Sequence, residues 1–138
     1  MRVLHVFKTY HPDSFGGVER TIHAIAKGCL AHDIQSDVLS LSRDPVVNTV
    51  EFDGHMAHKA KLDLEFASTG FSREAFSKFK DLSARADLVH YHFPWPFMDL
   101  MQEMQQIHEG PGKVDRRHLS FGYRETEAAA AALQALDA

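Results

Sequence analysis

The stretch "VLHVFKTYHPDSFGGVER" (residues 3–20) decides the fold, because it joins a buried strand to a helix through a glycine-containing loop. Val3 to Phe7 is a near-continuous apolar run, which is typical of a strand covered on both faces, as in parallel sheets. Beyond the loop, apolar residues recur at helical spacing and predict a helix with one buried face. These residues are Val18, Ile22, Ile25, Ala26, Cys29 and Leu30.

The following residues continue the alternation of strands and helices. Strands are predicted over 37–41, over "NTVEF" (48–52) and over "ADLVHYH" (86–92). In "KAKLDLEFAS" (59–68), apolar residues alternate with charged ones, which predicts a half-exposed or edge strand. Ser72 is expected to cap a helix whose apolar face carries Ala75, Phe76, Phe79 and Leu82. The predicted fold class is therefore α/β, a Rossmann-like, mainly parallel sheet flanked by helices.

A sharp change in composition divides the chain near Met101. Residues 1–101 are expected to form the patterned Rossmann-like domain, and residues 102–138 an atypical tail. The tail breaks at Gly110, Pro111 and Gly112 and ends in an alanine-rich stretch that predicts a helix.

Charge and composition exclude several classes of protein. The chain has 138 residues, 44% of them hydrophobic, and a net charge of -4, so no basic surplus points to nucleic acid as a partner. Its one cysteine, Cys29, excludes an internal disulfide and fits a reducing compartment. The N-terminus resembles neither a signal peptide nor a membrane span. We therefore expect a cytoplasmic protein.

The two glycines of the loop, Gly16 and Gly17, have two possible explanations. Backbone N–H groups at a helix N-terminus are unsatisfied and favour negative charge, and glycine lets a phosphate approach them closely. Alternatively, the pair serves only a tight turn between strand and helix. The loop matches neither the G-x-G-x-x-G fingerprint nor a P-loop.

Two segments resemble the N-terminal half of glycosyltransferases of the GT-B fold, in glycosyltransferase family 4. They are "MRVLHVFKTYHPDSFGGVERTIHAIAKG" (1–28) and "ADLVHYHFPWPFMDL" (86–100), and "FASTGFS" (66–72) resembles a segment of relatives that build bacterial lipopolysaccharide and other surface polysaccharides. The positions that match the family's motifs are Tyr10, Pro12, Gly16, Gly17, Glu19, Asp87, His90 and His92.

The resemblance implies a retaining sugar transfer from a nucleotide-sugar to a saccharide or lipid-linked acceptor, without a metal or another cofactor. Gly16 and Gly17 would approach the donor diphosphate, and His90 and His92 would lie near the acceptor side of the cleft as candidate catalytic residues. The family's second domain, which binds most of the donor, has no counterpart in the sequence. The resemblance thus implies a truncated or fused chain, inactive alone, and a location that is cytoplasmic and peripheral at the inner membrane.

Further residues are candidates for contact with substrate. Glu19 lies in the first turn of the predicted helix, and its role is left open. His11 belongs to "HPD", where a histidine and an aspartate could serve acid–base chemistry or stay solvated. Trp95, in "FPWPF", could line an apolar lip for an acceptor or lipid carrier, or it could belong to a packed loop.

Two alternative functions remain open. His90 and His92 project from the same face of a strand, so "HYH" could bind a metal in a hydrolase, with His5, His11 and His108 as candidates for further ligands. Otherwise the chain is a small, non-catalytic α/β interaction domain, which self-associates through an exposed sheet edge or the tail helix.

Overall fold

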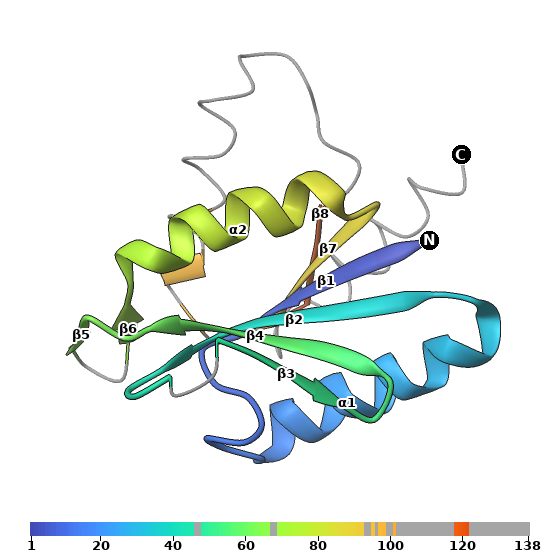
Figure 1. Ribbon diagram of the computed structural model, residues 1–138, viewed down its shortest axis with the longest axis horizontal. Helices are drawn as coiled ribbons and strands as arrows, with labels where there is room; N and C mark the ends of the chain where they lie inside the picture. Colours follow the sequence, from blue (N-terminus) through green and yellow to red (C-terminus); the bar gives the residue numbers. More distant parts are fainter. Residues whose placement is uncertain are drawn as a thin grey trace.

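A computed structural model describes residues 1–45, 48–66, 69–92, 95, 97–98, 101 and 118–121. Within these residues a six-stranded sheet has the order β3-β4-β2-β1-β7-β8 (Figure 1). Its strands in chain order are β1 (Arg2–Val6), β2 (Gln35–Ser42), β3 (Thr49–Phe52), β4 (His55–Lys61), β7 (Leu88–His92) and β8 (His118–Phe121). The other elements are α1 (Gly17–Cys29), the 3₁₀ turn η1 (Leu30–His32), α2 (Arg73–Arg85) and a hairpin of β5 (Leu64–Phe66) and β6 (Thr69–Phe71).

The sheet is mainly parallel, which confirms the predicted fold class. Adjacent strands are parallel along the order β4, β2, β1, β7, β8. Among the described strands of this sheet, only β3 is antiparallel to its neighbour, which is β4. The chain passes from β1 through α1 to β2 on one side, and through α2 to β7 on the other. The strand order therefore reverses at β1, and ligands of open α/β sheets bind beyond the carboxyl ends of the strands at such a point.

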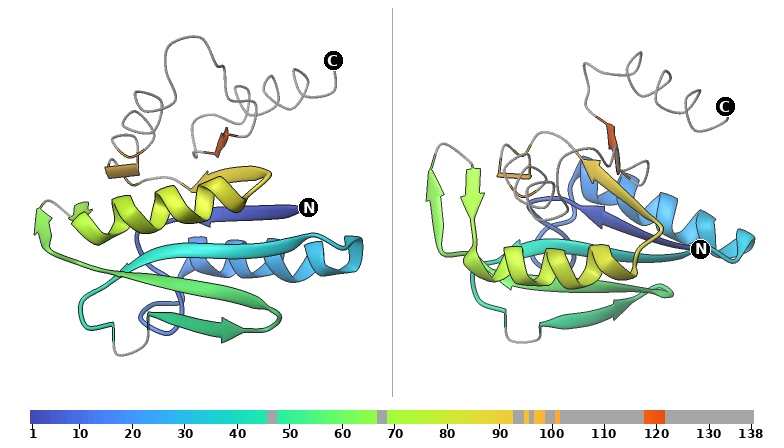
Figure 2. Two further views of the ribbon diagram at one scale, coloured as in Figure 1. Left: turned by 45° about the horizontal axis from the view of Figure 1, so that its top comes forward. Right: turned by 90° about the horizontal axis from the view of Figure 1, so that it is seen from above.

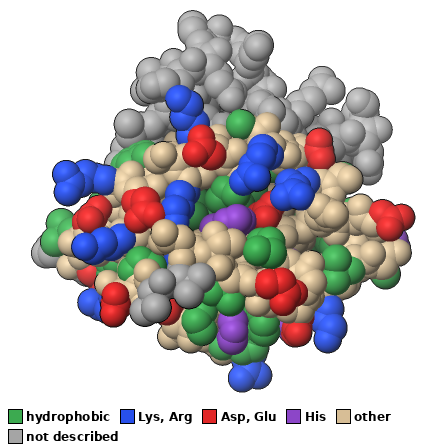
Figure 3. All heavy atoms as spheres, in the orientation of Figure 1, with side chains coloured by type: hydrophobic (Ala, Val, Ile, Leu, Met, Phe, Trp, Pro, Cys, Tyr) green, Lys and Arg blue, Asp and Glu red, His purple; other side chains and the backbone are tan. Residues whose placement is uncertain are grey.

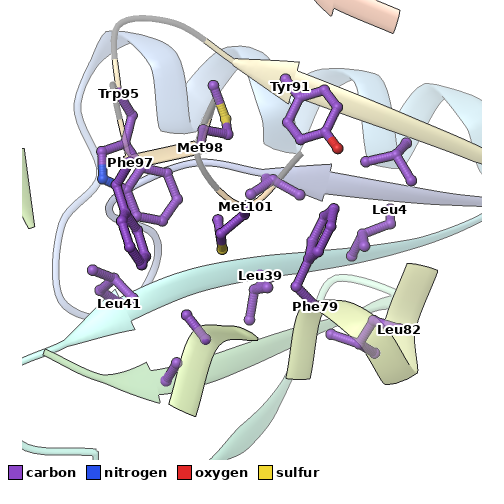
Figure 4. Close-up of a cluster of buried hydrophobic side chains, with 14 of the residues drawn as sticks. Leu4, Leu39, Leu41, Phe79, Leu82, Tyr91, Trp95, Phe97, Met98 and Met101 are labelled. Atoms are coloured by element: carbon purple, nitrogen blue, oxygen red, sulfur yellow. The ribbon is translucent and has the colours of Figure 1, made fainter. Parts of the chain in front are cut away.

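The two helices cover opposite faces of the sheet (Figures 1 and 2). Side chains alternate along β1, so Leu4 and Val6 join the core beneath α2, whereas Phe7 packs with Ile22 of α1. The larger core lies on the α2 face, and Figure 4 shows its aromatic, leucine and methionine side chains. It contains Leu39, Leu41, Phe79, Leu82, Tyr91, Trp95, Phe97, Met98 and Met101, among others. Burial on both faces explains the continuous apolar run of β1.

One strand prediction is wrong. The alternating segment 59–68 does not form one edge strand, because β4 ends at Lys61 and β5 begins at Leu64 in a separate hairpin. Strand β4 instead begins at His55, after a turn in which Asp53 (φ 46°) and Gly54 (φ 86°) both have left-handed backbone conformations. Such an Asp-Gly pair is typical of a tight hairpin turn, here between β3 and β4. Because β4 lies between β2 and β3, it is an interior strand of the sheet.

Part of the predicted tail joins the sheet, since residues 118–121 form β8 beside β7. The predicted alanine-rich helix and the breaks at residues 110–112 lie outside the described residues. Within the described part of the chain, no helix is long and apolar enough to cross a membrane.

The N-terminus of α2 allows the first test. Ser72 is the N-cap and its hydroxyl accepts a hydrogen bond from the backbone N–H of Ala75 at 3.1 Å, as predicted. We expect Ser72→Ala to lower the free energy of unfolding by about 1 kcal/mol in urea titrations, because the N–H loses its partner. The control is Ser77→Ala on the exposed side of the same helix, which should change stability by less than about 0.5 kcal/mol. Equal effects of the two substitutions would contradict this account.

Candidate functional site

A hollow of about 550 Å³ lies beyond the carboxyl ends of β1, β2 and β4, the edge at which the fold places ligands. The loop after β1, the residues after β2 and the β5–β6 hairpin form its walls. The lining residues are Lys8, Thr9, Asp13, Ser14, Leu41, Ser42, Arg43, Asp44, Leu62, Glu65 and Gly70. Of the candidates that the sequence singled out, Asp13 of the HPD segment lines this hollow. The other described candidates do not line it, although His11 and Gly16 belong to the same loop as Asp13 and Ser14.

Charges of both signs surround the hollow. Lys8 and Arg43 bring positive charge, and Asp13, Asp44 and Glu65 bring negative charge. Arg43 and Glu65 form an ion pair between the end of β2 and the hairpin. Figure 3 shows basic and acidic side chains interspersed on this face of the molecule, with several of both signs toward the end where the hairpin lies. The hollow can therefore offer polar contacts to hydroxyl groups as well as cations to an anion.

Glu19 holds the glycine loop in shape from within. It is buried, and its Oε1 accepts hydrogen bonds from the hydroxyls of Thr9 at 2.7 Å and Ser14 at 2.8 Å. Burial acts to raise the pKa of Glu19, but the hydrogen bonds from Thr9, Ser14 and the backbone N–H groups of Glu19 and Gly16 outweigh it and lower the pKa. The bond from Gly16, the N-cap of α1, is one half of a capping box.

Lys59 supports the same loop from the sheet. Its ammonium group is buried and donates to the carbonyl of Tyr10 and to Ser40 Oγ, each at 2.9 Å. Asp13 lies 3.7 Å from the ammonium group. Burial lowers the pKa of Lys59 to about 8, although the carboxylates of Asp13 and Glu19 act to raise it. A buried cation paired in this way ties the loop to β4 and β2.

The two glycines differ in their surroundings. A Cβ on Gly16 would lie 3.2 Å from Glu19 Oε2, so this position is crowded by the carboxylate that stabilises the loop. A Cβ on Gly17 would meet nothing within 4 Å, and neither glycine has a positive φ. Neither backbone conformation nor packing among the described residues therefore requires glycine at position 17. Gly17 itself is exposed, whereas the backbone N–H groups of Gly16 and Glu19 already donate to the Glu19 carboxylate.

His11 and Trp95 have contacts that the sequence did not reveal. The His11 ring stacks on Phe52 of β3 with centroids 3.9 Å apart. Trp95 is completely buried in the core beneath α2, and its indole N–H donates to the carbonyl of Gly70 at 3.1 Å. The indole therefore supports the β5–β6 hairpin from inside and forms no lip on the surface.

His90 and His92 lie on the α1 face of β7, and the structure brings His5 of β1 beside them. The ring centroids of His90 and His92 are 4.0 Å apart, and that of His5 lies 5.1 Å from His90 and 5.3 Å from His92. His5 Nδ1 and His92 Nε2 share a hydrogen bond of 3.0 Å. His11 is not part of this group, and His108 lies outside the described residues.

Apart from Asp13, sequence reasoning missed the residues that line the hollow, and it also missed the lysine below it. Ser42, Arg43 and Asp44 follow β2 directly, so the rule that ligands bind at the carboxyl ends of parallel strands could have found them. No such rule identifies Lys59, because a lysine within an alternating segment is usually exposed. Only the packing of the loop over β4 shows that it is buried.

Comparisons with known proteins relate the chain to sugar transferases. No family model matches it. Over 101 residues it is 50% identical to D-rhamnosyltransferase WbpZ of Pseudomonas aeruginosa and 43% identical to O-antigen chain mannosyltransferase C of Escherichia coli. Each alignment covers 73% of this chain, but 26% and 27% of the respective relative. The chain thus spans about a quarter of the length of these curated relatives.

The buried carboxylate of the loop gives a pH-dependent prediction. Since the pKa of Glu19 is lowered from its ordinary 4.5, the ionised group stabilises the fold above that pH, and this stabilisation is lost as the pH falls through the folded-state pKa. We expect Glu19→Gln to be less stable than the parent chain at about pH 7, and the difference to shrink below about pH 4.5. Chemical denaturation across this range measures it. Asp81→Asn, on the exposed side of α2, is the control, and an unchanging difference down to about pH 3 would refute the role of Glu19.

Proposed function

We propose that the chain is the acceptor-side domain of a glycosyltransferase that acts in bacterial surface-polysaccharide or lipopolysaccharide synthesis. The observation that carries the proposal is the identity of 50% and 43% to two sugar transferases over 101 residues. Those relatives are named as a rhamnosyltransferase and an O-antigen mannosyltransferase. The reaction is the transfer of a sugar from a nucleotide-sugar to a saccharide or lipid-linked acceptor.

The glycine loop is the part that would meet the donor diphosphate. Helix α1 begins at Gly17, where a Cβ would meet nothing within 4 Å. Backbone N–H groups and the helix dipole would stabilise the negative charge of the diphosphate as it becomes a leaving group. Glu19 and Lys59 would keep the loop in one conformation, which reduces the entropy lost on binding.

The hollow beside the loop would hold the acceptor. Its mixture of Asp13, Ser14, Ser42 and Asp44 suits sugar hydroxyl groups, which both donate and accept hydrogen bonds. The exposed cations Lys8 and Arg43 could contact a phosphate of a lipid-linked acceptor. His90 and His92 remain predicted acceptor-side residues.

The names of the relatives narrow the donor sugar. D-Rhamnose is D-mannose without its 6-hydroxyl group. A single pocket that recognises the manno configuration would therefore accept both sugars. We therefore infer a donor with a manno-configured sugar. We further propose a GT-B architecture of glycosyltransferase family 4 and retention of configuration at the anomeric carbon. The chain would bind substrate but would need the donor half of the enzyme for transfer. Its location would be cytoplasmic and peripheral at the membrane.

Calorimetric titration of the full chain with GDP-mannose tests the proposal. We expect binding, and we expect Gly17→Val to weaken it at least about tenfold, because the valine side chain would occupy the space that the diphosphate needs. UDP-mannose and GDP-glucose, titrated in parallel, separate recognition of the nucleotide from recognition of the sugar.

Gly28→Val is the matched control. It introduces the same side chain into the other end of the same helix, where a Cβ also meets nothing within 4 Å, so it should leave binding unchanged. Failure of the folded parent chain to bind any of these nucleotide-sugars would contradict the proposed site, as would equal binding by the Gly17→Val variant. Equal weakening by both valines would point to the helix and not to the diphosphate.

A further inference from the structure

Three histidines converge where the strand order of the sheet reverses. We call His5, His90 and His92 the histidine cluster. The parallel register of β1 and β7 sets His5 opposite His90, and His92 follows two residues later on the same face. One ring nitrogen from each residue lies within 4.8 Å of the other two. Among the described residues, these three histidines are the group of potential metal ligands whose ligand atoms lie within this distance of one another.

The spacing of these nitrogens is near that of ligands on one metal ion. Two imidazole nitrogens on a tetrahedral zinc ion lie about 3.3 Å apart, as follows from a Zn–N distance of about 2.0–2.1 Å. His5 Nδ1 and His92 Nε2 are already 3.0 Å apart. Movements on the order of 1 Å would bring the third nitrogen to the same spacing.

The surroundings of the cluster keep the rings in the form that binds metals. Burial lowers the pKa of all three imidazoles, that of His90 to about 4, and the neighbouring rings lower those of His5 and His92 further. A neutral imidazole is the form of histidine that binds metal ions. His90 is half-buried and is the least buried of the three residues.

One ring nitrogen of His5 lacks a hydrogen-bond partner among the described residues. The ring is completely buried, and its Nε2 has no hydrogen-bond partner among the described residues. Its Nδ1 contacts only the neutral ring of His92, and one proton at most can lie between the two nitrogens. No described donor therefore occupies a lone pair on His5 Nε2.

We propose that His5, His90 and His92 bind a divalent transition metal of the zinc type. Three neutral imidazoles suit zinc, nickel and copper, whereas magnesium and calcium prefer oxygen ligands. Such an ion would cross-link β1 and β7. This inference is argued from the geometry of the cluster and not from the proposed sugar transfer, although the two proposals share His90 and His92. We expect micromolar affinity, because His5 lacks the second hydrogen-bond partner that ordinarily strengthens such sites by 10- to 100-fold.

Titration of the metal-stripped full chain with Zn²⁺ tests the site. We expect one ion to bind per chain, the melting temperature to rise by several degrees with Zn²⁺ and to stay constant with Mg²⁺, and His90→Gln to weaken binding at least about tenfold. His90 is the least buried of the three histidines, so a substitution at this position should disturb the fold least. His23→Gln is the matched control, because His23 belongs to a separate aromatic group with Phe52 and His55.

The outcomes separate clearly. Weakened binding in His90→Gln with unchanged binding in His23→Gln supports the cluster. A folded chain that binds no Zn²⁺ up to about 100 µM, or a His90→Gln variant that binds as well as the parent, overturns it. If His90→Gln fails to fold, Co²⁺ bound to the parent chain decides: an intense d–d spectrum of four-coordinate cobalt supports the site, and a weak six-coordinate spectrum or no bound cobalt overturns it.

Discussion

Burial of β1 on both faces is the constraint on which the rest of the structure depends. The strand lies between β2 and β7, so its backbone is paired on both edges and its side chains must serve two separate cores. Leu4 and Val6 satisfy one core and Phe7 the other. The chain that leaves this strand can only emerge at the carboxyl edge of the sheet, and that is where the glycine loop, the hollow and His92 are found.

Two buried charges give the loop after β1 a single conformation. Glu19 is surrounded by donors from the loop itself, and Lys59 donates to the loop from the sheet below. Each would be costly if left unpaired in the interior, so the loop is held in the arrangement that pairs both. The polarity of this region thus serves the structure of the loop, and Gly17 is the position of the loop where a Cβ would meet nothing within 4 Å.

Local patterns predicted the elements whose chemistry is local. The apolar run of β1, the helical spacing of α1 and the cap at Ser72 all appear as expected, since each depends on residues near one another in sequence. The segment 59–68 was predicted wrongly because alternation of apolar and charged residues indicates which side chains are exposed. It does not indicate which strands pair with one another. Lys59 occupies a position that alternation predicts to be exposed, but the loop after β1 covers it. Trp95 is buried by contacts with α2 and the β5–β6 hairpin, which no local pattern around Trp95 specifies.

The α/β class and the mainly parallel sheet could be predicted from the sequence, because hydrophobic periodicity and turn residues act over a few neighbouring positions. The sequence also carried the similarity to sugar transferases. Only the tertiary structure decided which side chains distant in sequence meet. His5 and His90 are 85 residues apart in sequence, and the register of two parallel strands places them side by side. Lys59 is buried because the loop after β1 packs over β4. Such contacts arise from packing of the whole domain, and no short-range pattern specifies them.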